Sequence, residues 1–240
     1  MFEPLLESPR ALTERITVAL GGTAVERPGL SGSLNSKFDR FLNQLFASRN
    51  VAPRDAAATL EGRPGFVWLD ERPTDADIVP LQLLEMYGMT ASTTALVEQG
   101  PHDGEIGEVR SRDDLDGWFG VYSEVFGADP KGRDDWGRIN DALGPAGDGS
   151  LLLLLARVDG SPAATSAVFF QPDVAGLYCF TTLEQMRRRG LASALIHASH
   201  GAARARGIER AVLQATGSGR RAYARAGYRE ERLLPVLLSP

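Results

Sequence analysis

Apolar residues in the second half of the chain follow two spacings that predict a regular series of helices and strands. Apolar residues three or four apart are typical of a helix with one buried face, whereas short alternating or continuous apolar runs are typical of strands. Ser111 with Asp114 predicts a capping box at a helix start, and Asp159-Gly160-Ser161-Pro162 predicts a hairpin turn. The predicted elements are strand 105–109, helices 112–126 and 133–143, strands 151–158, 163–170 and 176–182, helix 190–206, strand 210–215, helix 218–226 and strand 232–238. This order predicts a mixed α/β sheet.

The first hundred residues have a less regular pattern. It predicts helices 8–20, 34–48 and 76–87, and strands 65–69 and 93–98. The second helix depends on the spacing of apolar residues, which are Phe38, Phe41, Leu42, Leu45 and Phe46. The stretch Gly100-Pro101-His102-Asp103-Gly104 is rich in helix and strand breakers. It predicts a boundary between an amino-terminal α/β domain, residues 1–104, and a second domain, residues 105–240.

Composition excludes several classes of protein. The chain is 43% hydrophobic and 24% charged, as is usual for a globular protein. Its apolar run at 151–156 is far shorter than the roughly 18–20 residues of a membrane span, and the start, MFEPLLESPR, resembles neither a signal nor a transit peptide. The single cysteine, Cys179, excludes an intramolecular disulfide and a multi-cysteine metal site. We therefore expect a cytoplasmic protein that is not bound to a membrane.

Charge is distributed unevenly along the chain. From Arg187 to Arg232 there are eleven arginines and three glutamates, a balance of +8, whereas the whole chain has a net charge of −5 and its remainder therefore −13. A basic carboxy-terminal segment on an acidic body indicates that one polyanion binds at one place. A protein that binds mainly the phosphate backbone of nucleic acid is usually basic overall, so nucleic acid is not an expected partner.

The sequence RRRGLAS, residues 187–193, lies where a predicted strand ends and a predicted helix begins. The first N–H groups of a helix have no partner within it and carry partial positive charge, so a phosphate fits in front of them. Gly190 has no Cβ and permits close approach of the backbone, and Ala192 and Ser193 keep the first turn narrow. This stretch is therefore a candidate anion-binding loop.

Three features of the second half resemble the GNAT superfamily of acyl-CoA-dependent N-acyltransferases. Arg187-x-x-Gly190-x-Ala192 resembles the family's pyrophosphate loop, and Thr181-Thr182 resembles the end of the strand that pairs with pantetheine. Tyr223-Ala224-Arg225-Ala226-Gly227-Tyr228 resembles the family's Tyr-x-x-x-Gly-Phe signature. The resemblance covers about residues 105–240. It implies a mixed, mostly antiparallel sheet in which two parallel strands, 176–182 and 210–215, separate as a V around the acyl-CoA.

The resemblance also implies roles for individual residues. The backbone N–H groups of Arg188, Gly190, Ala192 and Ser193 are expected to face the pyrophosphate, and Tyr223 is expected to protonate the departing CoA thiolate. The expected cofactor-binding residues are Phe180, Thr181, Thr182, Arg187, Arg188, Arg189, Gly190, Leu191, Ala192 and Ser193. Thr216 and Gly219 depart from the family pattern, in which asparagine and alanine are common at these positions. Packing alone is the other interpretation of Tyr223.

Other candidate residues favour structural roles. His197 and His200 fall on one stripe of the predicted helix 190–206, opposite its leucines, which predicts a solvated face rather than a metal site. Glu124 could act as a base, because it lies in the helix that borders the acceptor site in the family, but its position opposite the apolar stripe favours a surface role. Cys179 is expected to be a buried structural thiol.

The first half has a layout similar to that of the second when it is shifted by 139 positions. Leu84 then falls on Tyr223 and Gly88 on Gly227, and Ser48-Arg49-Asn50-Val51 falls where the loop lies. The similarity indicates either a degenerate GNAT-like copy without a cofactor loop or a chance match of two helix–glycine–strand units. In both cases we expect this half to shape the acceptor pocket or an interface.

The resulting hypothesis is an N-acetyltransferase that transfers an acetyl group from acetyl-CoA to a primary amine by direct attack, without a metal. The alternative is a non-catalytic CoA-binding regulatory module. A weaker alternative is a nucleic-acid-binding protein. Acetyl-CoA and an amine-bearing acceptor are the expected partners, and the protein is expected to be a monomer or a homodimer.

Overall fold

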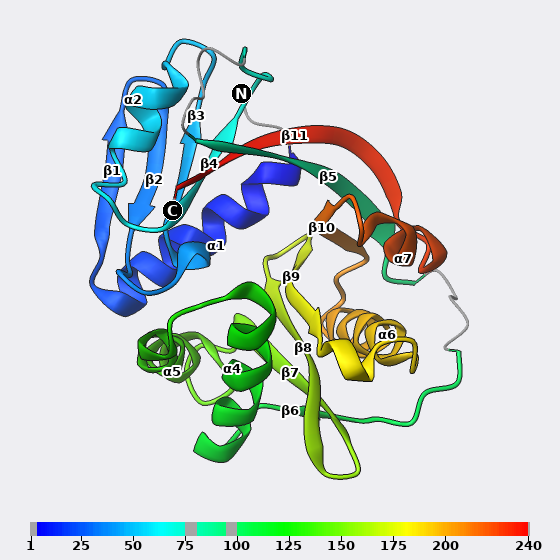
Figure 1. Ribbon diagram of the computed structural model, residues 1–240. Coiled ribbons are helices and arrows are strands. Elements are labelled where there is room, and N and C mark those ends of the chain that lie inside the picture. The colour runs from blue at the N-terminus through cyan, green and yellow to red at the C-terminus, as the bar shows by residue number, and fades with distance from the viewer. Residues whose placement is uncertain (1–3, 75–80, 95–99, 240) are drawn as a thin grey trace.

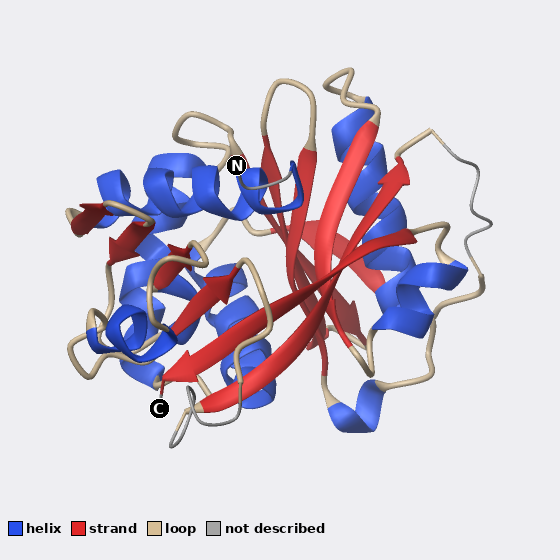
Figure 2. Ribbon diagram, turned by 90° about the horizontal axis from the view of Figure 1, so that it is seen from above, coloured by secondary structure: helices blue, strands red, loops and turns tan. Residues whose placement is uncertain are grey.

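A computed structural model describes residues 4–74, 81–94 and 100–239, which form a sheet flanked by helices on both faces (Figures 1 and 2). The strands are β1 Thr23–Arg27, β2 Leu30–Leu34, β3 Gln44–Ala47, β4 Gly65–Leu69, β5 Gln82–Ser92, β6 Glu105–Glu108, β7 Leu151–Val158, β8 Ser161–Phe170, β9 Ala175–Thr182, β10 Arg210–Thr216 and β11 Arg229–Ser239. The helices are α1 Pro4–Leu20, α2 Pro53–Ala58, α4 Arg112–Phe126, α5 Arg133–Leu143, α6 Leu191–Arg204 and α7 Arg220–Arg225, with 3-10 turns η1 Arg40–Leu42, η2 Pro130–Gly132 and η3 Glu184–Met186.

The described strands form one sheet in the order β1-β2-β3-β4-β11-β5-β10-β9-β8-β7-β6. Strand β5, from the first half of the chain, pairs antiparallel with β10, and β11, from the second half, pairs antiparallel with β4. The two exchanged strands also pair with each other along most of their length, as the long arch at the top of Figure 1 shows. Each half of the sheet is thus completed by a strand of the other half.

Two helical layers bury the faces of the sheet. Helix α1 packs together with α4 and α5 in a cluster that includes Leu12, Ile16, Trp118 and Trp136. The other face carries α6 and α7, whose apolar side chains join a cluster with β8, β9 and β10. The small helix α2 packs on β3 and β4.

A buried carboxylate connects the two halves. Asp39, directly before η1, accepts hydrogen bonds from Tyr122 Oη at 2.9 Å, from Trp136 Nε1 at 2.7 Å and from the Phe41 N–H at 2.9 Å. Burial raises the pKa of Asp39, while these three donors lower it in part. The carboxylate is therefore held by α4 and α5 of the second half, although it belongs to the first.

The second half agrees with the elements predicted from sequence. Its order of strands and helices is the predicted one, and Ser111 and Asp114 form the predicted capping box. The hairpin turn between β7 and β8 has positive φ at Asp159 and Gly160, 49° and 78°, as a two-residue type I′ turn requires.

The predicted helix 34–48 is wrong. The segment contains the end of β2, the short η1 turn and β3, in which all four residues are buried. The side chain of Asn43 bonds the backbone of Asn35, Ser36, Asp39 and Pro64, which stabilises an irregular loop. Pairing of β3 with both β2 and β4 then outweighs the helical spacing of the aromatic residues.

The predicted helix 76–87 is also wrong where it is described. Residues 82–87 belong to β5, which pairs with β10 on one side and with β11 on the other, while residues 76–80 lie outside the described part. Thr93 and Thr94 of the predicted strand 93–98 form a turn, and the rest of that stretch is not described. The match of Leu84 with Tyr223 fails as well, because the first lies in β5 and the second in α7.

Candidate active site

The two parallel strands β9 and β10 separate toward their carboxyl ends. They pair only from Ala175 to Leu177 with Ala211 to Leu213. Beyond these positions β9 continues along β8, and β10 continues along β5, with no register between the two. This arrangement is the V-shaped splay that the sequence predicted.

A bulge lies in β9 at the opening of the V. Thr165 pairs with Thr181 and Ala167 with Tyr178, so β9 has one residue more than β8 in this interval. Cys179 has φ of +54°, a conformation that is rare for a residue with a side chain. Bulges of this kind redirect backbone groups out of the ladder and are common beside active sites. The sequence carried no signal for it, because nothing about a cysteine indicates positive φ.

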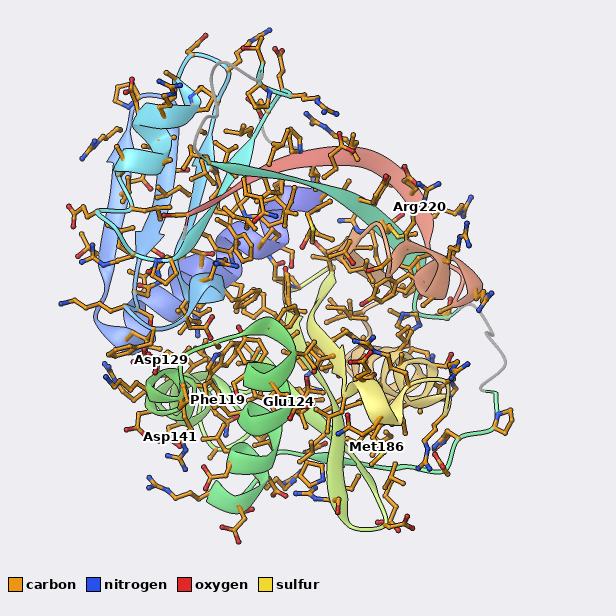
Figure 3. The ribbon with its side chains drawn as sticks, viewed as in Figure 1. Phe119, Glu124, Asp129, Asp141, Met186 and Arg220 are labelled. Carbon is orange, nitrogen blue, oxygen red and sulfur yellow. The ribbon has the colours of Figure 1, made fainter. Side chains whose placement is uncertain are left out.

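The arginine-rich loop leads from η3, which ends at Met186 (Figure 3), into α6. Arg188 and Gly190 both have positive φ, and Gly190 is the N-cap of the helix. The first backbone bond of α6 runs from Ala194 N to Gly190 O. Within the described part of the chain, the N–H groups of Leu191, Ala192 and Ser193 donate no hydrogen bond to another backbone group. These groups can bind an anion.

The linker 100–104 packs against this loop. A Cβ added at Gly190 would lie closer to the Pro101 carbonyl oxygen than van der Waals contact allows, and 3.1 Å from His102 Cβ. Arg189 forms an ion pair with Asp103 at 3.2 Å. Gly190 is therefore required for the seating of the loop on the linker, and its contact with a phosphate remains a prediction.

Tyr223 lies at the open side of the V. Its half-buried ring packs edge-on against Phe180 of β9, at 5.9 Å between ring centroids, and against Tyr228, at 5.8 Å. Burial raises the pKa of the Tyr223 phenol above its ordinary value of 10.0. The group therefore carries its proton at neutral pH.

The prediction of a solvated face at His200 is wrong. His200 is only 4% exposed, and its Nε2 lies 2.8 Å from Tyr228 Oη. Burial, together with the neighbouring Arg204 guanidinium, lowers the pKa of His200 to about 4, so the ring is neutral at pH 7. The histidine connects α6 to Tyr228, which in turn contacts Tyr223. A tyrosine where the family signature has phenylalanine was the signal that a polar partner would be needed.

The remaining candidates lie at the surface or in the core. Glu124 is exposed on α4 (Figure 3), and His197 is exposed on α6. Cys179 is buried, and burial raises the pKa of its thiol. Across the described ranges, no three His, Cys, Asp or Glu side chains are grouped so that they could hold a metal ion. None of the described helices combines the length and apolarity needed to cross a membrane.

The turn before α7 is held locally. Thr216 Oγ1 accepts a hydrogen bond from Gly219 N at 3.3 Å and lies 3.1 Å from Ser218 Oγ. Arg220, labelled in Figure 3, pairs with Glu230 at 2.9 Å and stacks over the ring of Tyr87 at 4.6 Å. The two departures from the family pattern thus take part in an ordered turn that presents Tyr223.

Comparison with known proteins finds a matching family model and similar structures. Residues 115–228 match the model of the acetyltransferase (GNAT) family. No curated protein was found to match the sequence. A GCN5-related N-acetyltransferase from Kribbella flavida is similar in structure, with a TM-score of 0.67, 19% identity and coverage of 100% of this chain and 97% of that one.

Two further structures are similar over nearly their whole lengths. A putative GNAT-family acetyltransferase from Novosphingobium aromaticivorans has a TM-score of 0.61 and 20% identity, and covers 98% of each chain. A protein of unknown function from Staphylococcus epidermidis has a TM-score of 0.66 and 15% identity, over 92% of this chain and 94% of that one. At these identities the likeness establishes the fold, including both halves.

Proposed function

We propose that the chain transfers an acetyl group from acetyl-CoA to a primary amine, because residues 115–228 match the model of the acetyltransferase (GNAT) family. The observation that carries this proposal is the combination of the V between β9 and β10 with the free N–H groups at the start of α6. The first accommodates an extended pantetheine arm, and the second a pyrophosphate. Helix α6 is the connection between these two strands, so both features belong to one strand–helix–strand unit.

The proposed reaction needs little from side chains. The neutral amine attacks the thioester carbonyl carbon, the carbon–sulfur bond breaks, and CoA leaves as a thiolate. Backbone N–H groups of Phe180 to Thr182, next to the bulge, polarise the carbonyl oxygen. The acceptor ammonium first loses one proton to water to give the neutral amine, and the nitrogen loses a second proton to water as the amide forms, since no described side chain stands out as a base.

Tyr223 donates its proton to the thiolate and regains one from solvent. The raised pKa keeps the phenol protonated, but it also makes it a weaker acid than the thiol it produces. The proton transfer therefore has to accompany cleavage of the carbon–sulfur bond. For this reason we expect a contribution at or below the lower end of the usual range for general acid catalysis.

The test is Tyr223→Phe, which keeps the ring between Phe180 and Tyr228 and removes only the proton. Turnover with an accepted amine is expected to fall by about tenfold or more, while acetyl-CoA affinity changes little. Tyr87→Phe is the matched control, because it removes a hydroxyl from a neighbouring ring that has no proposed role. Turnover and calorimetric binding are measured on the same preparations.

Three results would revise or contradict the proposal. Unchanged turnover in Tyr223→Phe would leave this tyrosine with a packing role only. Acetyl-CoA binding without turnover on any amine in a broad screen would favour the non-catalytic CoA-binding module. If millimolar acetyl-CoA gives no binding heat in calorimetry and no rise in melting temperature, acetyl-CoA is not the acyl donor.

A further inference from the structure

The amino-terminal helix α1 contacts both strands of the V at the position where they separate (Figure 1). The last paired residues are Leu177 and Leu213. The next residue of each strand bonds to α1: Tyr178 Oη lies 2.7 Å from Ser8 Oγ, and Gln214 Nε2 donates to the Leu5 carbonyl oxygen at 2.8 Å. One helix of the first half thus holds both strands of the second.

The first turns of α1 pack closely against the sheet. Leu5 packs between Val174 and Val212, which flank the start of the V. A Cβ added at Gly176 would overlap Ser8 Oγ, and one added at Gly88 would lie 2.7 Å from Leu5 Cδ1. Glycines in β5 and β9 therefore allow the helix to approach the sheet at this point.

A proline makes the bond to Gln214 necessary. In a regular helix the Leu5 carbonyl would accept the N–H of residue 9, but that residue is Pro9, which has none. The Gln214 side chain supplies the missing donor from β10. The proline thus leaves a carbonyl of α1 available to a strand of the V.

We infer that the first turns of α1 act as a brace that fixes the separation of β9 and β10, and with it the width of the acyl-CoA groove. Leu5, Ser8, Tyr178 and Gln214 are positioning residues, because they act on the groove through the two strands. Tyr178 also adjoins the bulge at Cys179, so the same contact orients the backbone that faces the thioester. This role rests on the proposed function only in that the groove binds acyl-CoA.

Three single variants and one double variant test the brace in the full chain. Ser8→Ala and Tyr178→Phe each remove one end of the same hydrogen bond, and Gln214→Leu removes the other contact. Each is expected to raise the KM for acetyl-CoA, and its Kd by calorimetry, by about three- to tenfold, as loss of one buried bond would. The double variant Ser8→Ala/Tyr178→Phe is expected to match the single ones, because the bond is lost only once.

Pro9→Ala distinguishes a role of α1 in positioning β10 from a role in the stability of the fold. It gives residue 9 an N–H that competes with Gln214 for the Leu5 carbonyl, and it removes a helix-breaking residue. The melting temperature is expected to stay or rise, while the KM for acetyl-CoA increases. Thr13→Val is the matched control, since the Thr13 hydroxyl is buried in the same helix but bonds only the Pro9 carbonyl.

Amide hydrogen exchange gives a readout that needs no ligand. Faster exchange in peptides covering 178–182 and 214–216 is expected in Ser8→Ala and Gln214→Leu, with no change over 151–158. Unchanged exchange and unchanged KM in these variants would overturn the brace. Faster exchange in a chain that does not bind acetyl-CoA at all would support the brace and contradict the proposed function.

Discussion

The two parallel strand–helix–strand units of this chain have the same topology, but the strands separate in only one of them. In the first half, β3 and β4 pair at every residue of β3, and backbone bonds from Phe66 to Asn43 and from Asp70 to Ala47 extend the contact. In the second half, β9 and β10 pair at three positions of a strand of eight residues. Pairing is closed in the first unit and opens into the V in the second.

The helices that connect the two strand pairs also differ, because only α6 begins with unpaired N–H groups. Helix α2 has six residues and begins with Pro53, which has no N–H, and the N–H groups of Asp55 and Ala56 already bond the Ala52 carbonyl. Helix α6 has fourteen residues and begins with free N–H groups after a glycine N-cap. The two units thus share their topology. A bulge, a short parallel register and an open helix start distinguish the unit in which we propose the cofactor site.

Separating the two halves is expected to have the largest effect. A fragment of residues 105–240 lacks β5, so β10 loses one partner, and β11 loses both of its neighbours. We expect it not to fold alone by circular dichroism, and to regain structure when residues 1–104 are co-expressed. A folded, monomeric fragment would instead support the boundary at residues 100–104 as a true domain division.

A negative charge introduced at the start of α6 is expected to weaken acetyl-CoA binding, whereas the same charge at the start of α2 is expected to leave binding unchanged. Ala192→Glu places a carboxylate where it occupies the free N–H groups and repels a phosphate, and acidic residues are well tolerated in the first turn of a helix. Acetyl-CoA affinity is expected to fall by at least about 100-fold by calorimetry, as loss of two hydrogen bonds to a charged group would give. Ala52→Glu, at the start of α2, is the control, and equal losses in both variants would contradict the assignment of the loop.

Alanine substitutions at two glycines distinguish the cost of backbone strain from the cost of a steric clash. Gly190 and Gly62, which follows α2, have similar φ of 73° and 76°, but a Cβ would overlap Pro101 only at Gly190 and would meet no atom within 4 Å at Gly62. Gly62→Ala is expected to cost about 1 kcal/mol of the free energy of unfolding, and Gly190→Ala clearly more. Denaturant titration measures both. Equal costs would show that the linker does not constrain the loop.

The last expected effect concerns pH and is negligible at neutral pH. His200 has a pKa of about 4 in the folded chain against 6.5 for an unperturbed histidine. Its contribution to stability is therefore complete above pH 6.5 and is lost as the pH falls toward 4, by on the order of 3 kcal/mol. His200→Gln is expected to flatten the fall in melting temperature over this range, whereas His197→Gln, at an exposed position, should leave it unchanged. An equal slope in all three proteins would contradict the buried neutral histidine.

The sequence by itself determined what depends on neighbouring residues. The capping box at Ser111, the turn at Asp159 and Gly160, the loop before α6 and every element of the second half follow from spacings within about fifteen residues. Such spacings report the local period of burial, and the family signature adds the prediction of a cofactor site at these elements.

Only the tertiary structure decided what depends on distant partners. The strand at β3 and the strand at β5 have spacings compatible with helices, and they are strands because each is paired on both sides. The exchange of β5 and β11, the burial of His200 against Tyr228 and the bonds from α1 to Tyr178 and Gln214 join residues far apart in the chain. A local pattern records that a side chain is buried, but not which segment buries it, and in this protein distant segments hold β9 and β10 where they separate.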